Sequence, residues 1–472
     1  MLVQLDQKKY EYEFYELLRF FLPKEEIRFK GEDQDTLIQS DKDKNITLYI
    51  EGKRWEKQVP EIRDPKKQKR AYKKAAVDLL ESAFQKKCPW GVLTGIRPVK
   101  IIQELMDEGY GEGEIFTIMT QEYGLSEEKA RLIQEVAKTQ RPFLYPIHKN
   151  SYSLYLNIPF CPTRCDYCSF PTHLYKKKDI RKEYVDLLLY EMEELSKPLQ
   201  DLDLDAIYIG GGTPTVLEIE DLERLLDGIR NHFSTWSEWT VEAGREDTLT
   251  AEKLILMKKK GVTRISLNPQ TFHQPTLERI GRRQDNERLL SLYKEAKKIG
   301  FEAINMDFIL GLPGEGLEEL EKNLKKIESL LPENLTIHTL SVKRGSKFME
   351  RNRDLFQEKE TIDAMIDRVE DFLKDSPYKP YYLYRQKQIL GNYENIGYAL
   401  EGKENRYNMY IMEERQSIIG LGMTANTKFL HPESNRIVNY RNFKNMKDYK
   451  EKLQETIEAK KRIIKGEIIE RI

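Results

Sequence analysis

The middle of the chain alternates between short apolar runs and longer amphipathic segments. The apolar runs have the length of buried strands, and the segments between them carry apolar residues at the spacing of a helix face. The predicted strands are Ser153–Ile158, Ala206–Ile209, Thr240–Ala243, Arg264–Asn268, Ala303–Leu310 and Leu335–Thr339. The predicted helices are Ile180–Ser196, Ile219–His232, Ala251–Lys260, Asn286–Ile299 and Leu317–Leu331. Such alternation requires a parallel sheet with right-handed crossovers.

Six strands of this kind favour a partial (β/α)6 barrel within an α/β fold. An open doubly wound sheet has a similar periodicity and stays an alternative at this point. Both architectures place the active site at the C-terminal ends of the strands. We therefore look for chemistry in the residues that follow each apolar run.

Different patterns flank this central region. Before it, Leu2–Leu5 and Ile46–Ile50 alternate like strands, and Tyr10–Leu22 has an apolar face at helical spacing. Helical patterns follow and end near Arg141–Pro146, where two prolines stop helical continuation. After Thr339 the alternation stops, and mostly helical patterns return. We predict three parts: an N-terminal α+β accessory domain over 1–145, the barrel over 151–345, and a mostly helical C-terminal region over 346–472 that caps the substrate side.

Composition narrows the class of protein. The chain has 472 residues, of which 33% are charged, and a formal net charge of -1. This length is enough for several domains. The balanced charge gives no global signature of nucleic-acid binding, and no window is long and apolar enough to span a bilayer. We expect a cytoplasmic protein with no nucleic-acid partner and no membrane span.

Three of the four cysteines lie within eight residues, as Cys161, Cys165 and Cys168, directly after the first predicted strand. Clustered thiols in a reducing compartment indicate a metal site rather than disulfides. A [4Fe-4S] cluster held by three cysteines has one iron open to an external chelate. The alternative is a structural zinc site, which needs a fourth ligand such as His173. The remaining cysteine, Cys88, has no nearby ligand partner and is interpreted as a buried apolar side chain.

Polar and glycine residues follow the other predicted strands. The run Gly210–Thr213 ends the second strand with little side-chain bulk, so that a ligand can approach the backbone. Further candidates follow or lie within the later strands, and they carry both signs of charge, which suits a ligand with a zwitterionic amino-acid end and a ribose. These candidates are Glu242, Gln270, Arg282 and Asp307.

The chain resembles the radical S-adenosylmethionine (SAM) family of oxygen-independent coproporphyrinogen III oxidases over roughly its whole length, and most closely its HemZ-type coproporphyrinogen dehydrogenase branch. The resemblance rests on Tyr155–Phe170, Gly210–Thr215, Val241–Arg245, Arg264–Phe272, Asn305–Gly314 and Tyr381–Ala399. It implies a partial (β/α)6 barrel, and a [4Fe-4S] cluster on Cys161, Cys165 and Cys168. It also implies SAM contacts from Tyr155, Tyr167, Gly211, Gly212, Thr213, Glu242, Gln270, Arg282 and Asp307.

Two positions depart from the oxygen-independent oxidases proper. The family has His where this chain has Asn157, and a further Cys where it has Phe170. Related branches that lack those residues include haem chaperones and haem-degrading radical methyltransferases. The resemblance therefore implies the cofactors for all three activities, and the substrate stays open between porphyrinogen and haem.

The activity implied by the resemblance is oxidative decarboxylation of two coproporphyrinogen III propionates to vinyl groups, which gives protoporphyrinogen IX. The implied partners are the tetrapyrrole and a reducing electron donor such as flavodoxin or ferredoxin. A substrate with several carboxylates needs cationic groups, because arginine pairs with a carboxylate through two parallel hydrogen bonds. Arg344, past the last predicted strand, and Arg385, in an aromatic segment, are the candidates, with ordinary solvated cations as the alternative.

Overall fold

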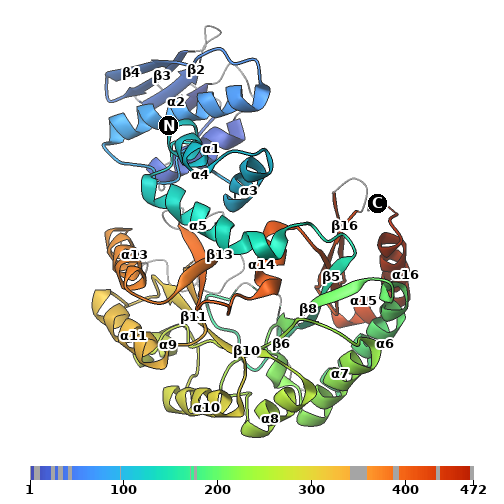
Figure 1. The fold of residues 1–472 in the computed structure, drawn as a ribbon. Helices are drawn as coiled ribbons and strands as arrows, with labels where there is room; N and C mark the ends of the chain where they lie inside the picture. The colour runs from blue at the N-terminus through green and yellow to red at the C-terminus, as the bar shows by residue number, and fades with distance from the viewer. Residues whose placement is uncertain are drawn as a thin grey trace. The chain divides into compact units, whose positions relative to one another are not determined.

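The computed structural model describes residues 2–4, 11–22, 27–29, 36–40, 45–95, 97–168, 170, 172–174, 178–340, 359–385, 393–431 and 436–467. The chain divides into two compact units (Figure 1). The first unit comprises Met1–Thr139 and Leu383–Lys387, and the second comprises Gln140–Tyr382 and Gln388–Ile472.

The first unit contains a four-stranded sheet in the order β1-β2-β3-β4, in which only the β1–β2 pair is parallel. Its elements are β1 (Leu2–Gln4), α1 (Glu11–Phe21), β2 (Thr36–Ser40), β3 (Asn45–Ile50), β4 (Lys53–Gln58), α2 (Pro65–Phe84), α3 (Val99–Asp107), α4 (Glu112–Thr117) and α5 (Glu127–Leu144), of which the residues from Gln140 onward belong to the second unit. The two strands and the first helix expected from the sequence are β1, β3 and α1. The helical pattern expected to end near Arg141–Pro146 ends at Leu144, the last residue of α5.

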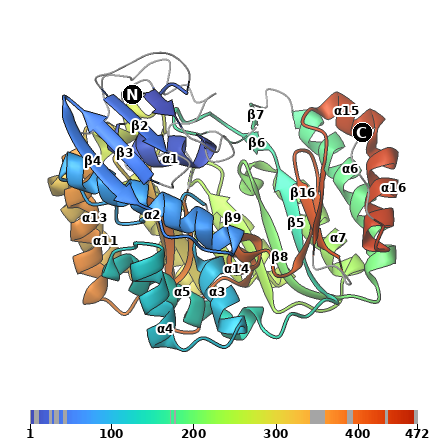
Figure 2. The same cartoon turned by 90° about the horizontal axis from the view of Figure 1, so that it is seen from above.

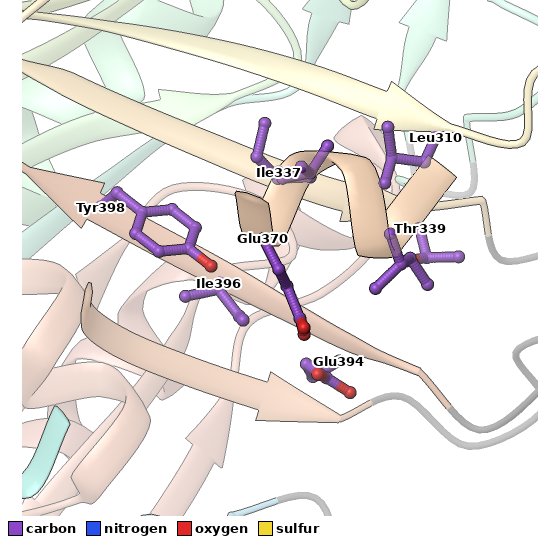
Figure 3. Close-up of a pocket in the computed structure, with 9 residues that line it drawn as sticks. Leu310, Ile337, Thr339, Glu370, Glu394, Ile396 and Tyr398 are labelled. Carbon is purple, nitrogen blue, oxygen red and sulfur yellow. The ribbon is translucent and has the colours of Figure 1, made fainter. Parts of the chain in front are cut away.

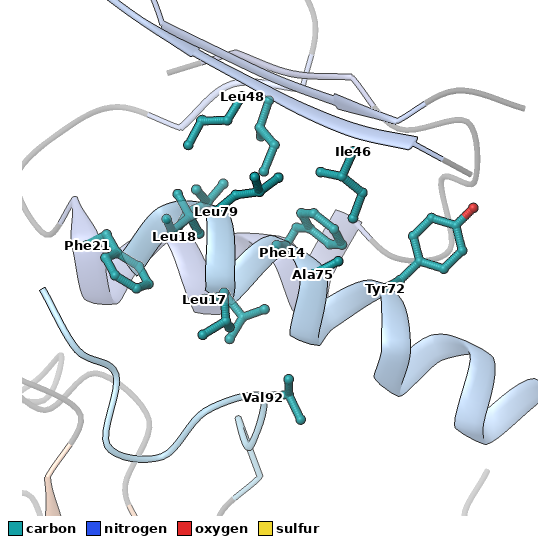
Figure 4. Close-up of a cluster of buried hydrophobic side chains, with 14 of the residues drawn as sticks. Phe14, Leu17, Leu18, Phe21, Ile46, Leu48, Tyr72, Ala75, Leu79 and Val92 are labelled. Carbon is teal, nitrogen blue, oxygen red and sulfur yellow. The ribbon is translucent and has the colours of Figure 1, made fainter. Parts of the chain in front are cut away.

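Apolar side chains of α1 and α2 pack under the sheet of the first unit (Figure 4). Leu18, Ile46 and Leu48 are among the side chains with no exposed surface. The start of α2 is set by Asp64, whose carboxylate accepts hydrogen bonds from the N–H groups of Lys66 and Lys67 at 2.7 and 2.9 Å. This unit therefore has a hydrophobic core of its own.

The second unit is built on a sheet of eleven strands in the order β13-β14-β12-β11-β10-β9-β8-β5-β15-β16-β17. The six strands from β5 to β12 in this order are mutually parallel, which confirms the predicted partial barrel. They are β5 (Ser151–Ile158), β8 (Asp203–Gly211), β9 (Glu238–Gly244), β10 (Arg264–Leu267), β11 (Ala303–Leu310) and β12 (Asn334–Thr339).

Helices connect successive parallel strands on the outside of the barrel (Figures 1 and 2). They are α6 (Lys178–Ser196), α7 (Ile219–His232), α8 (Ala251–Lys260), α10 (Asn286–Ile299) and α11 (Leu317–Leu330), with the short α9 (Gln274–Arg279) before α10. Local capping sets their ends: the Thr250 hydroxyl accepts from the Lys253 N–H at the start of α8, and Gly261 ends it with a φ of 101°. Five crossovers of this kind confirm the predicted helices.

The C-terminal region extends the sheet at both edges, which the sequence did not predict. β14 pairs antiparallel with β12, and β15 pairs parallel with β5. The added elements are α13 (Lys359–Lys374), β13 (Lys379–Arg385), β14 (Glu394–Ala399), α14 (Arg406–Glu413), β15 (Ser417–Leu421), β16 (Asn426–Leu430), β17 (Ile437–Arg441), α15 (Met446–Glu451) and α16 (Leu453–Ile464). The expectation of a mostly helical region therefore missed five strands, because segments of five to seven residues are too short for their periodicity to separate strand from helix.

Helix α14 closes the N-terminal end of the barrel (Figure 1). The Asn405 amide donates to Thr240 of β9 at 2.9 Å, and the Arg406 N–H donates to Glu238 of β9 at 3.1 Å. The Asn334 amide of β12 donates to the Lys403 carbonyl at 2.8 Å. Since these contacts lie at the starts of the strands, ligands have access to the barrel interior from the opposite, C-terminal end.

Candidate functional site

The cysteine loop leaves β5 at the C-terminal end of the barrel. β6 (Phe160–Cys161) and β7 (His173–Leu174) form a small parallel pair at its base. The Asp166 N–H donates to the Ile280 carbonyl at 2.9 Å, and the Cys168 N–H donates to the Cys165 carbonyl at 3.1 Å. Backbone hydrogen bonds thus hold the loop that carries all three cysteines.

The donor set fits an iron–sulfur cluster better than a single metal ion. Cys161 and Cys165 are buried, and Cys168 is partly exposed. Burial raises the pKa of Cys161 to about 11, so its thiolate form needs a positive partner such as iron. Within the described residues, no three His, Cys, Asp or Glu side chains converge in a way that would hold a metal ion. Three thiols are one short of the four protein ligands of a structural zinc site, whereas a cluster can bind each of them through a different iron.

The glycine run at the end of β8 lies directly against the cysteine loop. The Gly212 N–H donates to the Ile158 carbonyl at 2.8 Å, and the Thr213 N–H donates to the Phe160 carbonyl at 2.9 Å. A Cβ atom on Gly212 would lie 2.5 Å from the Phe160 oxygen, which no residue with a side chain can adopt without displacement. The Thr213 hydroxyl lies 3.4 Å from the Cys161 sulfur. The glycines thus allow two loops of the site to touch.

Glu242 at the end of β9 is a buried carboxyl group beside this run. It accepts a hydrogen bond from the Tyr208 hydroxyl at 2.6 Å and a further one from the Gly211 N–H. Burial, with a smaller contribution from the charge of Asp307, raises the pKa of Glu242 from 4.5 to about 7. The site therefore contains a carboxyl group that changes charge near neutral pH.

This shift predicts a pH-dependent effect of Glu242→Gln on stability. Between pH 4.5 and 7 the folded protein binds more protons at Glu242 than the unfolded chain does, so its free energy of unfolding falls as the pH rises through this window. Without SAM, we expect the variant to exceed wild type by about 1–3 kcal/mol at pH 8 and to lose most of this gain at pH 5. Denaturant unfolding at both pH values measures it, with the exposed Glu220→Gln as control. An equal difference at both pH values would contradict the assignment.

Gln270, in the segment that follows β10, lies beside Asp307 of β11. The Gln270 N–H donates to the Asp307 carbonyl at 2.9 Å. Burial alone would raise the pKa of Asp307, but hydrogen bonds from His338, Asn305 and Thr336 outweigh it, so this pKa is lowered. Asp307 therefore stays charged beside the titrating Glu242.

Two buried guanidinium groups face the cysteine loop from the other side. Arg282 Nη1 lies 3.4 Å from the Tyr167 hydroxyl, and Arg282 Nη2 donates to the carbonyls of Gly244 and Asn268. Arg245 Nη1 donates to the Cys165 sulfur at 3.6 Å. Arg245 was not among the predicted site residues. Its position three residues after Glu242, at the end of the same strand, could have indicated that it belongs to the site.

Three tyrosine rings stack next to Glu242. The ring centroids of Tyr208 and Tyr407 are 4.4 Å apart, and those of Tyr155 and Tyr407 are 5.9 Å apart. The Tyr155 hydroxyl donates to Asn157 Oδ1 at 2.9 Å, while the Asn157 amide donates to the Met423 carbonyl at 2.6 Å. Asn157, the first departure from the oxidases proper, therefore joins a predicted SAM contact to the turn after β15. Tyr407 belongs to α14, and no local sequence signal points to its place here.

Contacts in the described residues thus bring the nine predicted SAM contacts and the three cysteines into one continuous site. Of the two predicted substrate cations, Arg344 lies outside the described residues. Arg385 is 6% exposed, lies 4.7 Å from the Trp90 ring centroid and donates to the Leu93 carbonyl within the first unit. The Arg385 guanidinium therefore contacts an aromatic ring and a backbone carbonyl of the protein itself. Phe170, the second departure, is 61% exposed.

Two cavities of the second unit lie away from the cysteine loop. A cavity of about 30 Å³ between β11, β12, β14 and α13 is lined by Leu310, Ile337 and Glu394 among others (Figure 3), and holds little more than a water molecule. A larger cavity of about 410 Å³ is lined by residues at the starts of the strands, including Asp203 and Gln416. Neither cavity is lined by residues of the cysteine loop.

The fold and the cysteine loop define a class that comparison with known proteins confirms. The model of the radical SAM superfamily matches residues 156–327. Members of this superfamily use a [4Fe-4S] cluster and SAM, and these are the cofactors of this chain. None of the helices in the described part of the chain combines the length and apolarity of a bilayer-spanning segment.

Individual relatives narrow the class further. The oxygen-independent coproporphyrinogen-III oxidase-like protein HemZ of Bacillus subtilis (strain 168) is 40% identical over 382 residues, which cover 79% of this chain and 76% of HemZ. The chain therefore belongs to the family of oxygen-independent coproporphyrinogen III oxidases and their HemZ-type relatives within the radical SAM proteins.

The chain is also similar to a haem chaperone and to a solved structure of a coproporphyrinogen III oxidase. The haem chaperone HemW of Bacillus subtilis is 32% identical over 283 residues, which cover 58% of this chain and 70% of HemW. The structure of coproporphyrinogen III oxidase HemN from Escherichia coli superposes with a TM-score of 0.56 at 22% identity, covering 68% of this chain and 73% of HemN. The latter likeness shows the fold.

Proposed function

We propose that the protein oxidatively decarboxylates two propionates of coproporphyrinogen III to vinyl groups and so forms protoporphyrinogen IX. The observation that carries this proposal is the 40% identity to HemZ across 79% of the chain. The aligned length exceeds that of the barrel, so the similarity includes parts of the chain beyond the cofactor site. In each round, the substrate would lose a hydrogen atom from a propionate β-carbon, then CO2 and one further electron.

The residues of the site support this chemistry by binding and positioning. Together, the bound cluster and SAM supply a 5′-deoxyadenosyl radical that removes hydrogen from an unactivated C–H bond. Cys161, Cys165 and Cys168 would hold three irons, and the glycine run would offer backbone groups to SAM. Charged Asp307 and Arg282 would orient the polar ends of SAM, while the Tyr155–Tyr208–Tyr407 stack supplies a rigid wall. A dedicated acid–base pair is not needed for this reaction.

A haem chaperone is the second candidate. Two observations favour it. One is the similarity to HemW. The other is that this chain has Asn157 and Phe170 in place of the His and the Cys of the oxidases proper, and that this His and this Cys are also absent from the branches that do not oxidise porphyrinogen. A haem-degrading methyltransferase would use the same cofactors. These three functions differ in what happens to the tetrapyrrole, which makes them separable in one assay.

The test is anaerobic incubation of the reconstituted full chain with SAM, a reductant and coproporphyrinogen III, followed by mass spectrometry. The proposal predicts a product in which vinyl groups replace two propionates, formed with 5′-deoxyadenosine. Stable haem binding without that product would favour the chaperone, and a methylated linear tetrapyrrole from haem would favour the degradative enzyme. Flavodoxin or ferredoxin in the cytoplasm is the proposed physiological reductant, and comparison of each with dithionite tests it.

A further inference from the structure

Arg245 contacts a cluster ligand without being one of the predicted SAM contacts. Its side chain is 5% exposed, and Nη1 donates to the Cys165 sulfur at 3.6 Å. A charge-assisted N–H···S bond from a buried guanidinium stabilises negative charge on the sulfur. Among the described contacts, Cys165 is the cysteine whose sulfur receives a cationic donor.

The structure fixes the Arg245 side chain in this position. Its Nε and Nη2 donate to both carboxylate oxygens of Asp247 at 2.9 and 2.6 Å. The backbone around it is also held, since the Thr248 hydroxyl donates to the Arg245 carbonyl at 3.2 Å and the Thr215 hydroxyl donates to the Ala243 carbonyl at 3.0 Å. Thr215 belongs to the segment that follows the glycine run. The loop after β9 is thus tied to the same β8 end that touches the cysteine loop.

Other charged groups face Arg245 from neighbouring elements. Arg282 is a second buried cation on this side of the loop, and it reaches the cysteine loop through the Tyr167 hydroxyl. Glu246 is buried and accepts a hydrogen bond from the Asp285 N–H at 3.0 Å. Asp247 is partly exposed, so its charge is more screened than that of Arg245. The negative charges near Arg245 therefore offset only part of its positive charge at the Cys165 sulfur.

We propose that Arg245 tunes the reduction potential of the [4Fe-4S] cluster through Cys165, with Asp247 limiting its effect. Reduction adds one electron, converting [4Fe-4S]2+ into [4Fe-4S]+ without forming or breaking a bond. Hydrogen bonds and positive charge at the cluster sulfurs favour the more negative, reduced form and so raise the potential. Arg245 is a positioning and electrostatic residue in this role. The inference rests on the cluster and not on the identity of the tetrapyrrole.

The test is an anaerobic dithionite titration of the reconstituted full chain, in which EPR measures the fraction of [4Fe-4S]+. In Arg245→Gln, we expect the ratio of reduced to oxidised cluster at a fixed potential to fall about tenfold, which equals a shift of about 59 mV for one electron. Asp247→Asn should move the potential in the opposite direction, because it leaves the Arg245 charge without its partner. Arg245→Lys, which keeps the charge, should restore part of the loss.

Iron content separates tuning from a loss of the cluster, and Arg230→Gln on the exposed face of α7 is the matched control. If Arg245→Gln does not retain iron, the reduction potentials of Asp247→Asn and Arg245→Lys still test the proposal. Unchanged potentials in the iron-containing variants, or shifts of the same sign for Arg245→Gln and Asp247→Asn, would overturn the proposal. Failure to convert coproporphyrinogen III leaves it intact, since the potential is measured without substrate.

Discussion

Replacing Cys165 by alanine abolishes cluster assembly and, with it, all cleavage of SAM. Three thiolates are the complete protein ligand set expected for this cluster, so the loss of one leaves two. Removing Cys165 also leaves Arg245 Nη1 without its sulfur acceptor. After anaerobic reconstitution, we expect iron, sulfide and 5′-deoxyadenosine to fall to the background of a sample without protein.

Cys88→Ala is the matched control for this experiment. Cys88 is buried in the hydrophobic core of the first unit, where burial raises its pKa to about 11 and its sulfur lies 3.6 Å from the Gly91 carbonyl oxygen. This variant should keep both iron and SAM cleavage at wild-type levels. A Cys165→Ala protein that still cleaves SAM, or a Cys88→Ala protein that loses iron, would contradict the ligand assignment.

The largest expected loss of stability comes from Lys460→Met. Lys460 of α16 and Glu191 of α6 are both 0% exposed, and Nζ lies 2.7 Å from Glu191 Oε1. Glu191 also accepts from the Gly422 N–H at 2.8 Å and from the Tyr449 hydroxyl at 2.7 Å. Since removal of one partner leaves a buried charge uncompensated, we expect the free energy of unfolding of the second unit to fall by about 3–5 kcal/mol.

Chemical denaturation of the full chain measures this loss, with Lys461→Met as the neighbouring control. Lys461 pairs with Glu194 where both side chains are about one-fifth exposed, so its replacement should cost about 1 kcal/mol or less. A second replacement, Glu191→Gln, should recover part of the Lys460→Met loss, because it removes the uncompensated charge and keeps an oxygen that can accept from Gly422 and Tyr449. Equal losses for Lys460→Met and Lys461→Met would show that the buried pair has no special role.

The same network connects stability to the site. The Tyr184 hydroxyl of α6 donates to the Asn157 carbonyl and accepts from the Met423 N–H at 3.1 Å. Asn157 in turn holds Tyr155. We therefore expect Lys460→Met to weaken SAM binding as well, without changing the iron content of correctly folded protein.

Local signals explain why the barrel was predictable from sequence. Helices α7, α8 and α10 have the predicted bounds, since residues such as Thr250 and Asp285 cap their starts and Gly261 and Gly300 end them. Strand β11 also has the predicted bounds, because its apolar run is buried along most of its length. The cysteine spacing and the glycine run are likewise local features, so the cofactor site could be located before its geometry was known.

The parts that escaped prediction depend on contacts between distant segments. β14 pairs with β12 and β15 pairs with β5, across long separations that a sequence window does not contain. Tyr407 reaches the tyrosine stack only because α14 closes the barrel. Arg245 was overlooked for another reason: an arginine after a strand is usually a solvated cation, and its burial against Cys165 is a property of the folded loop.

EPR spectroscopy of the reduced cluster, with and without SAM, tests most directly whether the cysteine loop holds a cluster with one iron open to SAM. A [4Fe-4S]+ cluster with three cysteine ligands should give a signal that changes when SAM binds to the iron without a cysteine, and this change should be absent in Cys165→Ala. A [4Fe-4S]+ signal that SAM leaves unaltered, or a protein that binds zinc and assembles no cluster, would contradict it.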